Sequence, residues 1–191
     1  MSVRWAKSIP SFQQLGATDQ QLLLESSWSQ LFILSLAQWA VHLNKEQLLR
    51  DSFTPLNQQD ELSDEITELC EMVTRISQLR LDHTEYTCLK ALVLFKPEVL
   101  NLKQHLQVEV LQDQTHLMLQ EYCLAKPVSA NKVRFGRLLL VLPSINKFNK
   151  QTIEALFFRR TLGNIGVDRL VADLAQVCKL LTSAPKACII G

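Results

Sequence analysis

The chain has 191 residues, of which 47% are hydrophobic and 20% are charged, with only 5 glycines and 6 prolines. This composition predicts one domain of long helices around a sizeable core, and it disfavours a turn-rich β fold. A formal net charge of +1 provides no overall attraction to DNA, RNA or an anionic membrane. No apolar run reaches the roughly 18 to 20 residues of a membrane span.

Cysteine and histidine usage gives no sign of a metal site. The cysteines are odd in number and form no C-x-x-C pair, which favours a reducing compartment and buried thiols that bind no metal. His105 and His116 lie close to one face of a predicted helix, but no third ligand is near them in the sequence. A nucleophile elbow, a glycine-rich phosphate loop and a paired-carboxylate motif are also missing. We therefore expect no catalytic residue, no metal and no cofactor.

The first stretch has the pattern of a helix, a turn and a second helix. Residues 2–13 have helical spacing, and Pro10 and Gly16 indicate a compact turn. Thr18 is a suitable N-cap for the second helix, and Gln21 at the N3 position suits a capping box. The sequence therefore predicts that the second helix begins at Thr18.

Two apolar residues and a lysine distinguish this turn from a plain connection. Phe12 and Leu15 stand where turn residues are usually polar, so we expect them to hold the turn in the core. Lys7 stands at the end of the first helix, and the combination indicates a groove. The following helix, residues 18–41, is apolar around most of its circumference, which predicts a position in the middle of the domain.

Further helices are predicted from apolar residues at helical spacing and from start and stop signals. Asp82 is expected to cap one of them, with Glu85 at the N3 position completing a capping box. The predicted ranges are 45–51, 63–81, 83–95 and 102–125.

The C-terminal part begins with the longest helical pattern, residues 131–162. Pro143 should kink this helix because proline lacks an N–H, and the apolar stripe fits either the core or a contact with another subunit. Residues 163–166 form a helix stop. Residues 167–181 return to amphipathic helical spacing, and residues 182–191 are expected to be a loose tail.

The opening stretch resembles the signature that joins the third and fourth helices of nuclear receptor ligand-binding domains. The matching residues are Trp5-Ala6-Lys7, Phe12, Leu15, Asp19-Gln20 and Leu22-Leu23. Later segments resemble the family's eighth, tenth and eleventh helices: 89–95, 134–140 with Pro143, and 153–158. The resemblance runs from Val3 to about Leu174 and implies an all-α layered helical sandwich. It also implies that residues 1–181 are a partial domain lacking the first helix and part of the third.

Within the family, four segments are most similar to the tailless and photoreceptor-specific orphan branch: 38–40, 81–86, 111–114 and 158–164. The family implies a regulator of transcription in the nucleus, and for this branch we expect repression. The implied partners are a corepressor or coactivator helix and another nuclear receptor in a homo- or heterodimer. We expect no direct DNA contact and no membrane contact from this chain.

The resemblance implies a groove that binds a coregulator helix through its apolar face. Lys7 would meet the carbonyl groups at the C-terminus of that helix, and Asp173 would meet the N–H groups at its N-terminus. Each charge complements the helix dipole. Gln20, Leu24 and Glu25 would line the groove between them.

The resemblance also implies a dimer surface on the stripe of residues 134–158. Its candidate residues are Arg134, Phe135, Arg137, Leu138, Leu142 and Phe157. Gln30 departs from many heterodimerising relatives, which carry glutamate there, and Ala175 replaces a bulky residue of the last-helix motif. Two alternatives remain open: a helical carrier of an apolar small molecule, and a fragment that folds poorly because apolar surface stays uncovered.

Overall fold

The computed structural model describes residues 2–52, 59–126, 133–163 and 165–182, and the side chains of residues 3–52, 60–126, 133–163 and 165–174. Within these ranges the regular secondary structure is entirely helical, which confirms the predicted all-α class. The helices are α1 (Ser2–Lys7), α2 (Pro10–Gln13), α3 (Ala17–Gln38), α4 (Lys45–Asp51), α5 (Gln59–Gln78), α6 (His83–Leu94), α7 (His105–Leu124), α9 (Arg134–Leu139), α10 (Val141–Ile145), α11 (Lys150–Phe157), α12 (Arg159–Leu162) and α13 (Val167–Thr182).

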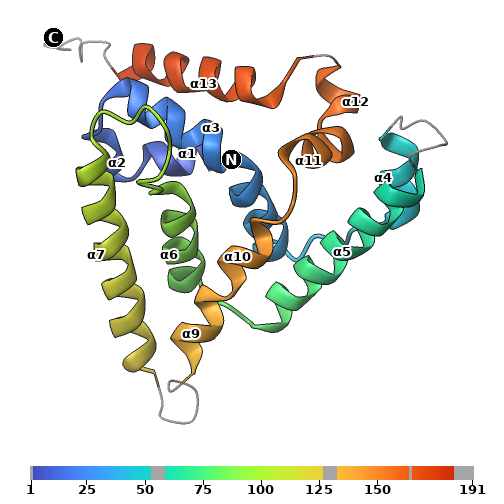
Figure 1. The fold of residues 1–191 in the computed structure, drawn as a ribbon, viewed down its shortest axis with the longest axis horizontal. Helices are drawn as coiled ribbons and strands as arrows, with labels where there is room; N and C mark the ends of the chain where they lie inside the picture. Colours follow the sequence, from blue (N-terminus) through green and yellow to red (C-terminus); the bar gives the residue numbers. More distant parts are fainter. Residues whose placement is uncertain (1, 53–58, 127–132, 164, 183–191) are drawn as a thin grey trace, which may run out of the picture.

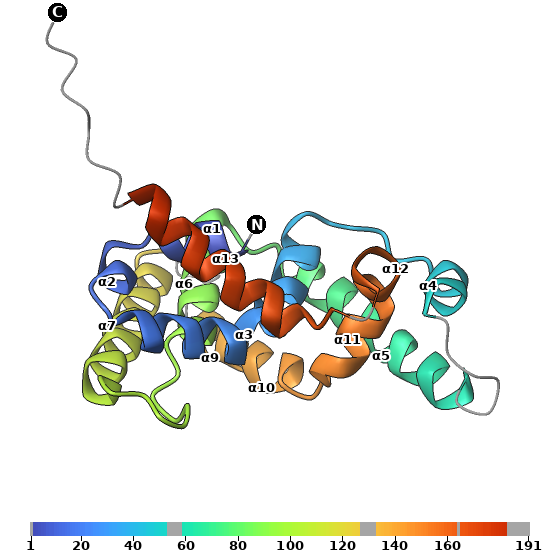
Figure 2. The same cartoon turned by 90° about the horizontal axis from the view of Figure 1, so that it is seen from above.

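Helix α3 is the centre of the fold. It packs against α1, α5, α6 and α13, and Figures 1 and 2 show α13 crossing over it on one side. The opposite side of α3 faces α6, while α7 and α9 extend the layer beyond α6 (Figure 1). The arrangement confirms the expected layered sandwich and the central place predicted for this helix.

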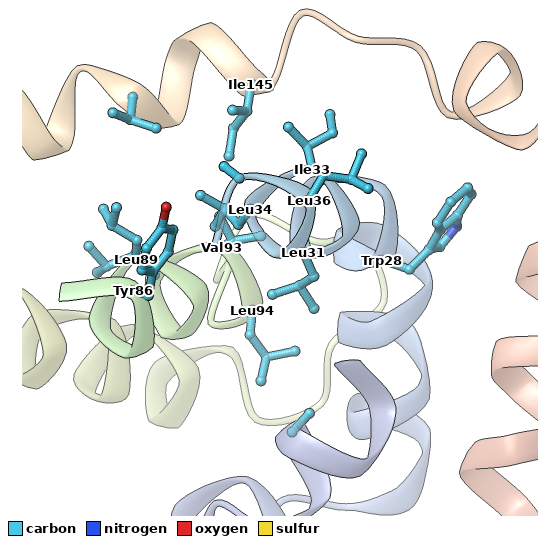
Figure 3. Packing of buried hydrophobic residues seen from close by; sticks show 14 of the residues in the cluster. Trp28, Leu31, Ile33, Leu34, Leu36, Tyr86, Leu89, Val93, Leu94 and Ile145 are labelled. Atoms are coloured by element: carbon cyan, nitrogen blue, oxygen red, sulfur yellow. The ribbon is translucent and has the colours of Figure 1, made fainter. Parts of the chain in front are cut away.

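Side chains from several directions around α3 are fully buried, which explains why this helix shows little amphipathic pattern. Leu31 and Leu34 have no exposed surface, and Figure 3 shows them near Val93 and Leu94 of α6. Ile33 is directed toward Ile145 of α10 in the same view. Each buried leucine or isoleucine contributes roughly 1.5 to 3 kcal/mol of burial free energy, so the buried side chains of α3 together make a large contribution to the core.

The capping box predicted at the start of α6 is confirmed. The Asp82 carboxylate accepts a hydrogen bond from the Glu85 backbone N–H at 2.9 Å, and the Glu85 carboxylate accepts one from the Asp82 N–H at 3.1 Å. Helix α4 also has the bounds predicted from the sequence, and Asn44 caps it by accepting from the Gln47 N–H at 3.0 Å. Both signals are local, so the sequence contains them completely.

The predicted N-cap at Thr18 is wrong. Helix α3 begins at Ala17, and Gly16 is its N-cap with φ −58° and ψ 149° and no side-chain hydrogen bond. The Gln20 N–H donates to the Gly16 carbonyl at 2.9 Å, which starts the helix before Thr18. The Gln21 side chain donates to Glu25 instead of completing a capping box.

Two predicted helices are interrupted at prolines. Residues 2–13 divide into α1 and α2, because Pro10 keeps Ile9 extended at φ −81° and ψ 117°. The pattern over 131–162 divides within its described part into α9, α10, α11 and α12 rather than forming one kinked helix. Pro143 cannot donate to the Leu139 carbonyl, and α9 ends at that residue.

The C-terminal predictions are confirmed in part. Gly163 has φ 62° and ends α12, so the predicted helix stop is present. Helix α13 covers the predicted amphipathic segment and includes Thr182, which the sequence had assigned to the tail. Residues 183–191, the rest of that predicted tail, lie outside the described residues. None of the helices in the described ranges combines the length and apolar character that crossing a bilayer would require.

Candidate functional site

A closed set of hydrogen bonds fixes Lys7 at the corner where α1, α2 and α3 meet. The Lys7 ammonium donates to the Gln20 side-chain carbonyl at 2.8 Å. The Gln20 amide then donates to the backbone carbonyls of Leu15 at 2.7 Å and Gln13 at 3.2 Å, and the Gln13 amide donates to the Lys7 carbonyl at 2.6 Å. The Gln20 side chain therefore acts as a structural link across the turn.

The apolar residues of the turn lie in the core, as predicted. Phe12 and Leu15 are buried, and the Phe12 ring packs against Phe95 with 6.4 Å between ring centroids. Because Phe95 directly follows α6, this contact ties the turn to the other side of α3. The corner that holds Lys7 is thus packed against the end of α6 through Phe12 and Phe95.

The remaining groove candidates have different environments. Leu24 is 1% exposed and therefore covered. Glu25 is half-buried; its carboxylate accepts from Gln21 at 2.8 Å, and its backbone carbonyl accepts from the Lys150 ammonium. Asp173 is exposed on α13. Lys7 and Gln20 are in direct contact, whereas Asp173 belongs to the separate helix that crosses them.

Helix α13 is held over α3 by polar contacts at its first turn. The Trp28 indole N–H donates to the Asp168 carboxylate at 2.6 Å, and the Lys150 ammonium lies 3.8 Å from the same carboxylate. The Glu154 carboxylate accepts from the Val167 backbone N–H at 3.2 Å. Farther along, α13 also touches α1, as Figure 2 shows from above. It therefore crosses the two helices whose ends carry Lys7 and Gln20.

An apolar cavity of about 450 Å³ lies between α3 and α13. Phe158 forms one wall, and its ring packs edge-on against Trp28 at 5.9 Å and tilted against Phe32 at 5.0 Å. Val171 and Leu174 supply part of the wall on α13. The complete lining is Val3, Trp28, Phe32, Ser35, Leu36, Trp39, Val41, Phe158, Val167, Leu170, Val171 and Leu174.

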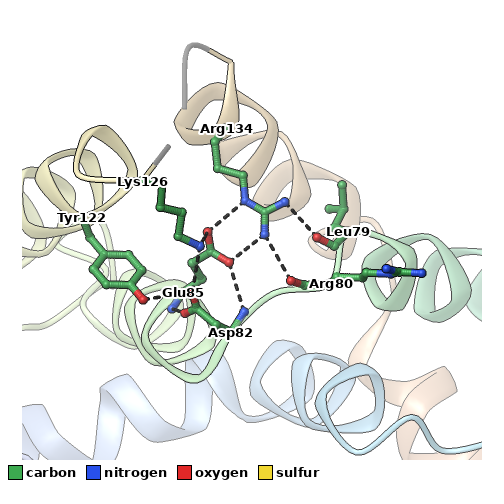
Figure 4. Close-up of polar contacts among 7 residues, drawn as sticks. All are labelled: Leu79, Arg80, Asp82, Glu85, Tyr122, Lys126 and Arg134. Atoms are coloured by element: carbon green, nitrogen blue, oxygen red, sulfur yellow. Dashed lines mark hydrogen bonds and ion pairs between the residues drawn. The ribbon is translucent and has the colours of Figure 1, made fainter. Parts of the chain in front are cut away.

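A buried ion-pair cluster joins α6, α7 and α9 on the other side of the molecule (Figure 4). The Glu85 side chain has no exposed surface and accepts from the Lys126 ammonium at 2.7 Å and from the Arg134 guanidinium at 2.6 and 2.8 Å. Lys126 also reaches Asp82 at 2.7 Å, and the Tyr122 hydroxyl donates to that carboxylate at 3.0 Å.

The cluster lowers the pKa of both carboxyl groups. Burial alone would raise the pKa of Glu85, but hydrogen bonds from Arg134 and Lys126 outweigh burial and hold it below its ordinary value. Burial likewise opposes ionisation of Asp82, and its hydrogen bonds, first among them that from Lys126, lower the pKa. Both groups are therefore ionised in the folded protein at neutral pH.

The dimer-surface candidates divide into internal and external residues. Arg134 is engaged within the chain, since it also donates to the Leu79 carbonyl at 2.8 Å, and Leu138 has no exposed surface. Arg137 is exposed, and Phe135, Leu142 and Phe157 are half-buried. The exposed and half-buried members could meet another subunit directly, whereas Arg134 and Leu138 could only support them from beneath.

A second buried polar contact, missed in the sequence, surrounds Gln30. Its amide donates to Asn146 at 2.5 Å, and its carbonyl accepts from the Lys96 ammonium. Burial lowers the pKa of Lys96. The sequence marked the departure at Gln30, but no local pattern pairs this residue with Lys96, which is 66 residues away in the chain. No group of three His, Cys, Asp or Glu residues in the described ranges could hold a metal ion.

Comparisons with known proteins agree with this geometry. A family model described as the ligand-binding domain of nuclear hormone receptor matches residues 1–162. The chain is 36% identical over 178 residues to steroid receptor seven-up, isoforms B/C, of Drosophila melanogaster, covering 91% of this chain and 33% of that protein. It is 37% identical over 179 residues to nuclear receptor subfamily 2 group F member 5 of Danio rerio, covering 91% of this chain and 44% of the relative.

These coverages mean that the chain spans between about a third and under half of the length of such curated relatives. Among solved structures, the ultraspiracle ligand binding domain from Drosophila melanogaster superposes with a TM-score of 0.69 at 23% identity, covering 91% of this chain and 74% of that chain. That likeness confirms the fold. Ligand-binding domains of this family are not enzymes, in keeping with the expectation for this sequence. The chain belongs to the family of nuclear hormone receptor ligand-binding domains.

Proposed function

We propose that the chain recruits an amphipathic coregulator helix at the corner of α1, α2 and α3, and that it represses transcription in the nucleus. The observation that carries this proposal is the position of α13, which crosses α3 and touches α1. Leu24, the apolar groove candidate, is 1% exposed. A last helix that lies over α3 and against α1 resembles the arrangement implied for the orphan branch, where the last helix favours corepressors.

The electrostatics of the corner suit a helix C-terminus. The ammonium of Lys7 lies at the end of α1 and is held by Gln20 at 2.8 Å. The last carbonyl groups of a docked helix carry partial negative charge, and a nearby cation contributes about 0.3 to 1 kcal/mol. Asp173, exposed on α13, would meet the N-terminal N–H groups only if α13 moved to stand beside the docked helix.

A peptide-binding experiment tests the proposal. We expect a fluorescent corepressor helix to bind the chain, and Lys7→Ala to weaken binding about two- to fivefold. Lys147→Ala is a matched control, because Lys147 is exposed on the turn after α10. Val171→Asp should act in the opposite direction and strengthen binding, because Val171 is a buried residue of α13 and a charge at this position should loosen the packing of that helix on α3.

Circular dichroism of each variant separates loss of binding from loss of folding. If the folded chain binds no such peptide, the groove assignment is wrong. If Val171→Asp strengthened peptide binding but Lys7→Ala had no effect, α13 would still compete with the peptide for the groove. The proposed contact between Lys7 and the peptide would then be wrong.

Dimerisation with another nuclear receptor is part of the same proposal. Phe135, Arg137, Leu142 and Phe157 would form its contact surface. The similarity to the group F and seven-up receptors supports placing the chain among the orphan receptors. Among these receptors, we propose the tailless and photoreceptor-specific branch. Analytical ultracentrifugation of Arg137→Glu would test the surface, since a reversed charge there should weaken any dimer.

The cavity beside α13 favours a second function, which is carriage of an apolar small molecule. Its volume of about 450 Å³ and its aromatic and aliphatic lining suit an uncharged ligand. Native mass spectrometry of the purified chain would test this function. A bound species that is lost in Val171→Asp supports it, and a chain that never retains any ligand argues against it.

A further inference from the structure

A small cavity of about 220 Å³ lies between α5 and the segment formed by α9 and α10. Helix α10 packs against α5, and Figure 1 shows the C-terminal end of α5 reaching the junction of α9 and α10. This cavity is separate from the larger one between α3 and α13, with which it shares no residue.

Each of its two walls is one face of a helix. On α5 the lining residues are 72, 75, 76 and 79, and on α9 and α10 they are 137, 140, 141 and 144. Both sets have the spacing of three, four and seven residues that places side chains on the same side of a helix. The two faces therefore meet across the cavity, and each brings one arginine, Arg75 or Arg137, among mainly apolar side chains.

The covered part of the cavity is apolar. Ile76 of α5 has no exposed surface, and Val141 of α10 is almost fully buried. Leu140 is 63% exposed, so an apolar side chain also stands where the cavity opens. Apolar walls combined with a few polar groups are typical of a site for a small molecule.

The two arginines supply positive charge that the protein does not neutralise. Neither guanidinium forms an ion pair or a side-chain hydrogen bond with another described residue. Glu71 precedes Arg75 by one turn of α5, but it is exposed and also forms no ion pair within the described ranges. Arg134, on the same helix as Arg137, is paired with the buried Glu85 at 2.6 Å.

The other polar lining residue adds no negative charge. The Ser144 hydroxyl donates to the Leu140 carbonyl at 3.0 Å. A guanidinium offers N–H groups in a planar fork that matches the two oxygens of a carboxylate. Two such forks on opposite walls, above an apolar floor, therefore suit a molecule with an anionic head and an apolar body.

We propose that this cavity binds a small organic carboxylate with a short alkyl chain. Its head would lie between Arg75 and Arg137, and its chain would lie against Ile76 and Val141. The volume is below the roughly 300 to 1,000 Å³ of sites for drug-sized ligands, which favours a single short chain over a two-chain lipid. The inference goes beyond the proposed function and does not rest on it, although Arg137 is also a candidate residue of the dimer surface.

Titration with octanoate, followed by the methyl signals of the full chain in NMR, tests the proposal. The signals of Ile76 and Val141 should shift, whereas that of Val171, which lines the larger cavity, should stay in place. Octan-1-ol has the chain without the charge, and acetate has the charge without the chain. Each should bind at least about tenfold more weakly than octanoate, because one of the two sets of contacts is lost.

Arg75→Gln and Arg137→Gln should each weaken octanoate binding at least about fivefold. Arg169→Gln is the matched control, because it removes the same charge from an exposed position on α13, and it should leave the affinity unchanged. Circular dichroism would verify that each variant is folded.

An absence of octanoate binding would overturn the proposal, as would equal affinities for octanoate and octan-1-ol. Shifts confined to Val171, or equal weakening by Arg169→Gln, would also overturn it. Because Arg75 is not a candidate for the dimer surface, Arg75→Gln tests this site independently of any effect on dimerisation.

Discussion

Substitution of Glu85 by glutamine should destabilise the chain far more than any surface ion pair could. The Glu85 side chain is completely buried and accepts from two cations and from the Asp82 backbone N–H. The glutamine variant carries no negative charge at this position, so Lys126 and Arg134 lose the buried carboxylate that they share. The side chains of these two cations are only 23% and 17% exposed. Breaking a buried pair in this way costs about 3 to 5 kcal/mol.

Urea unfolding followed by circular dichroism would measure this loss, together with a fall in Tm of roughly 6 to 20 °C for a chain of this size. Asp51→Asn provides the comparison, because it removes an ion pair with Arg160 at 2.9 Å in which the arginine side chain is 67% exposed. That variant should lose less than about 1 kcal/mol. If Glu85→Gln cost no more than Asp51→Asn, the cluster would not be a buried stabilising element.

The pH dependence of the same cluster has a definite sign. The folded-state pKa of Glu85 lies below its ordinary value because hydrogen bonds from Arg134 and Lys126 outweigh burial. The ionised Glu85 carboxylate therefore stabilises the folded chain at pH values above the pKa of an unfolded glutamate, about 4.3. This stabilisation is lost as the pH falls through the lower pKa of Glu85 in the folded chain. The wild-type chain should lose stability below about pH 4, and Glu85→Gln should show a smaller loss over the same range.

Three further substitutions test the supports of the central helix. Phe12→Ala should cost about 3 to 5 kcal/mol in urea unfolding, because Phe12 has no exposed surface. Asp19→Ala should cost about 1 to 3 kcal/mol by the same measurement, since Asp19 is 1% exposed and accepts from two backbone N–H groups at the start of α7. Trp28→Phe removes the 2.6 Å hydrogen bond to Asp168 but keeps an aromatic ring. Amide hydrogen exchange should therefore become faster in α13 and change little in α3 and α6. Equally faster exchange in all three helices would refute this local role of Trp28.

The features that the sequence predicted correctly are those encoded over a few neighbouring residues. The capping box of Asp82 and Glu85 depends on a spacing of three residues and forms as expected. The central position of α3 follows from apolar residues on all sides of one helix. Thr18 failed as an N-cap because Gly16 already adopts the extended backbone that starts the helix, and a glycine N-cap has no side-chain signal to detect.

What the sequence could not predict are contacts between residues far apart in the chain. Glu85 meets Lys126 and Arg134 across separations of 41 and 49 residues. From the sequence, Arg134 was a candidate for the dimer surface, because nothing local indicates that its guanidinium turns inward. Gln20 was likewise expected to line a groove, but its side chain is 7% exposed and holds the turn together.

The position of α13 makes two proposed activities interdependent. Val171 and Leu174 of this helix line the apolar cavity, and the same helix touches α1, which ends at Lys7. A ligand that fills the cavity would stabilise α13 where it lies, whereas a coregulator helix would require it to move. Linkage then demands that each partner weaken the other by the same factor. A coregulator affinity that stays the same when ligand saturates the cavity would show that α13 is not the element for which both of them compete.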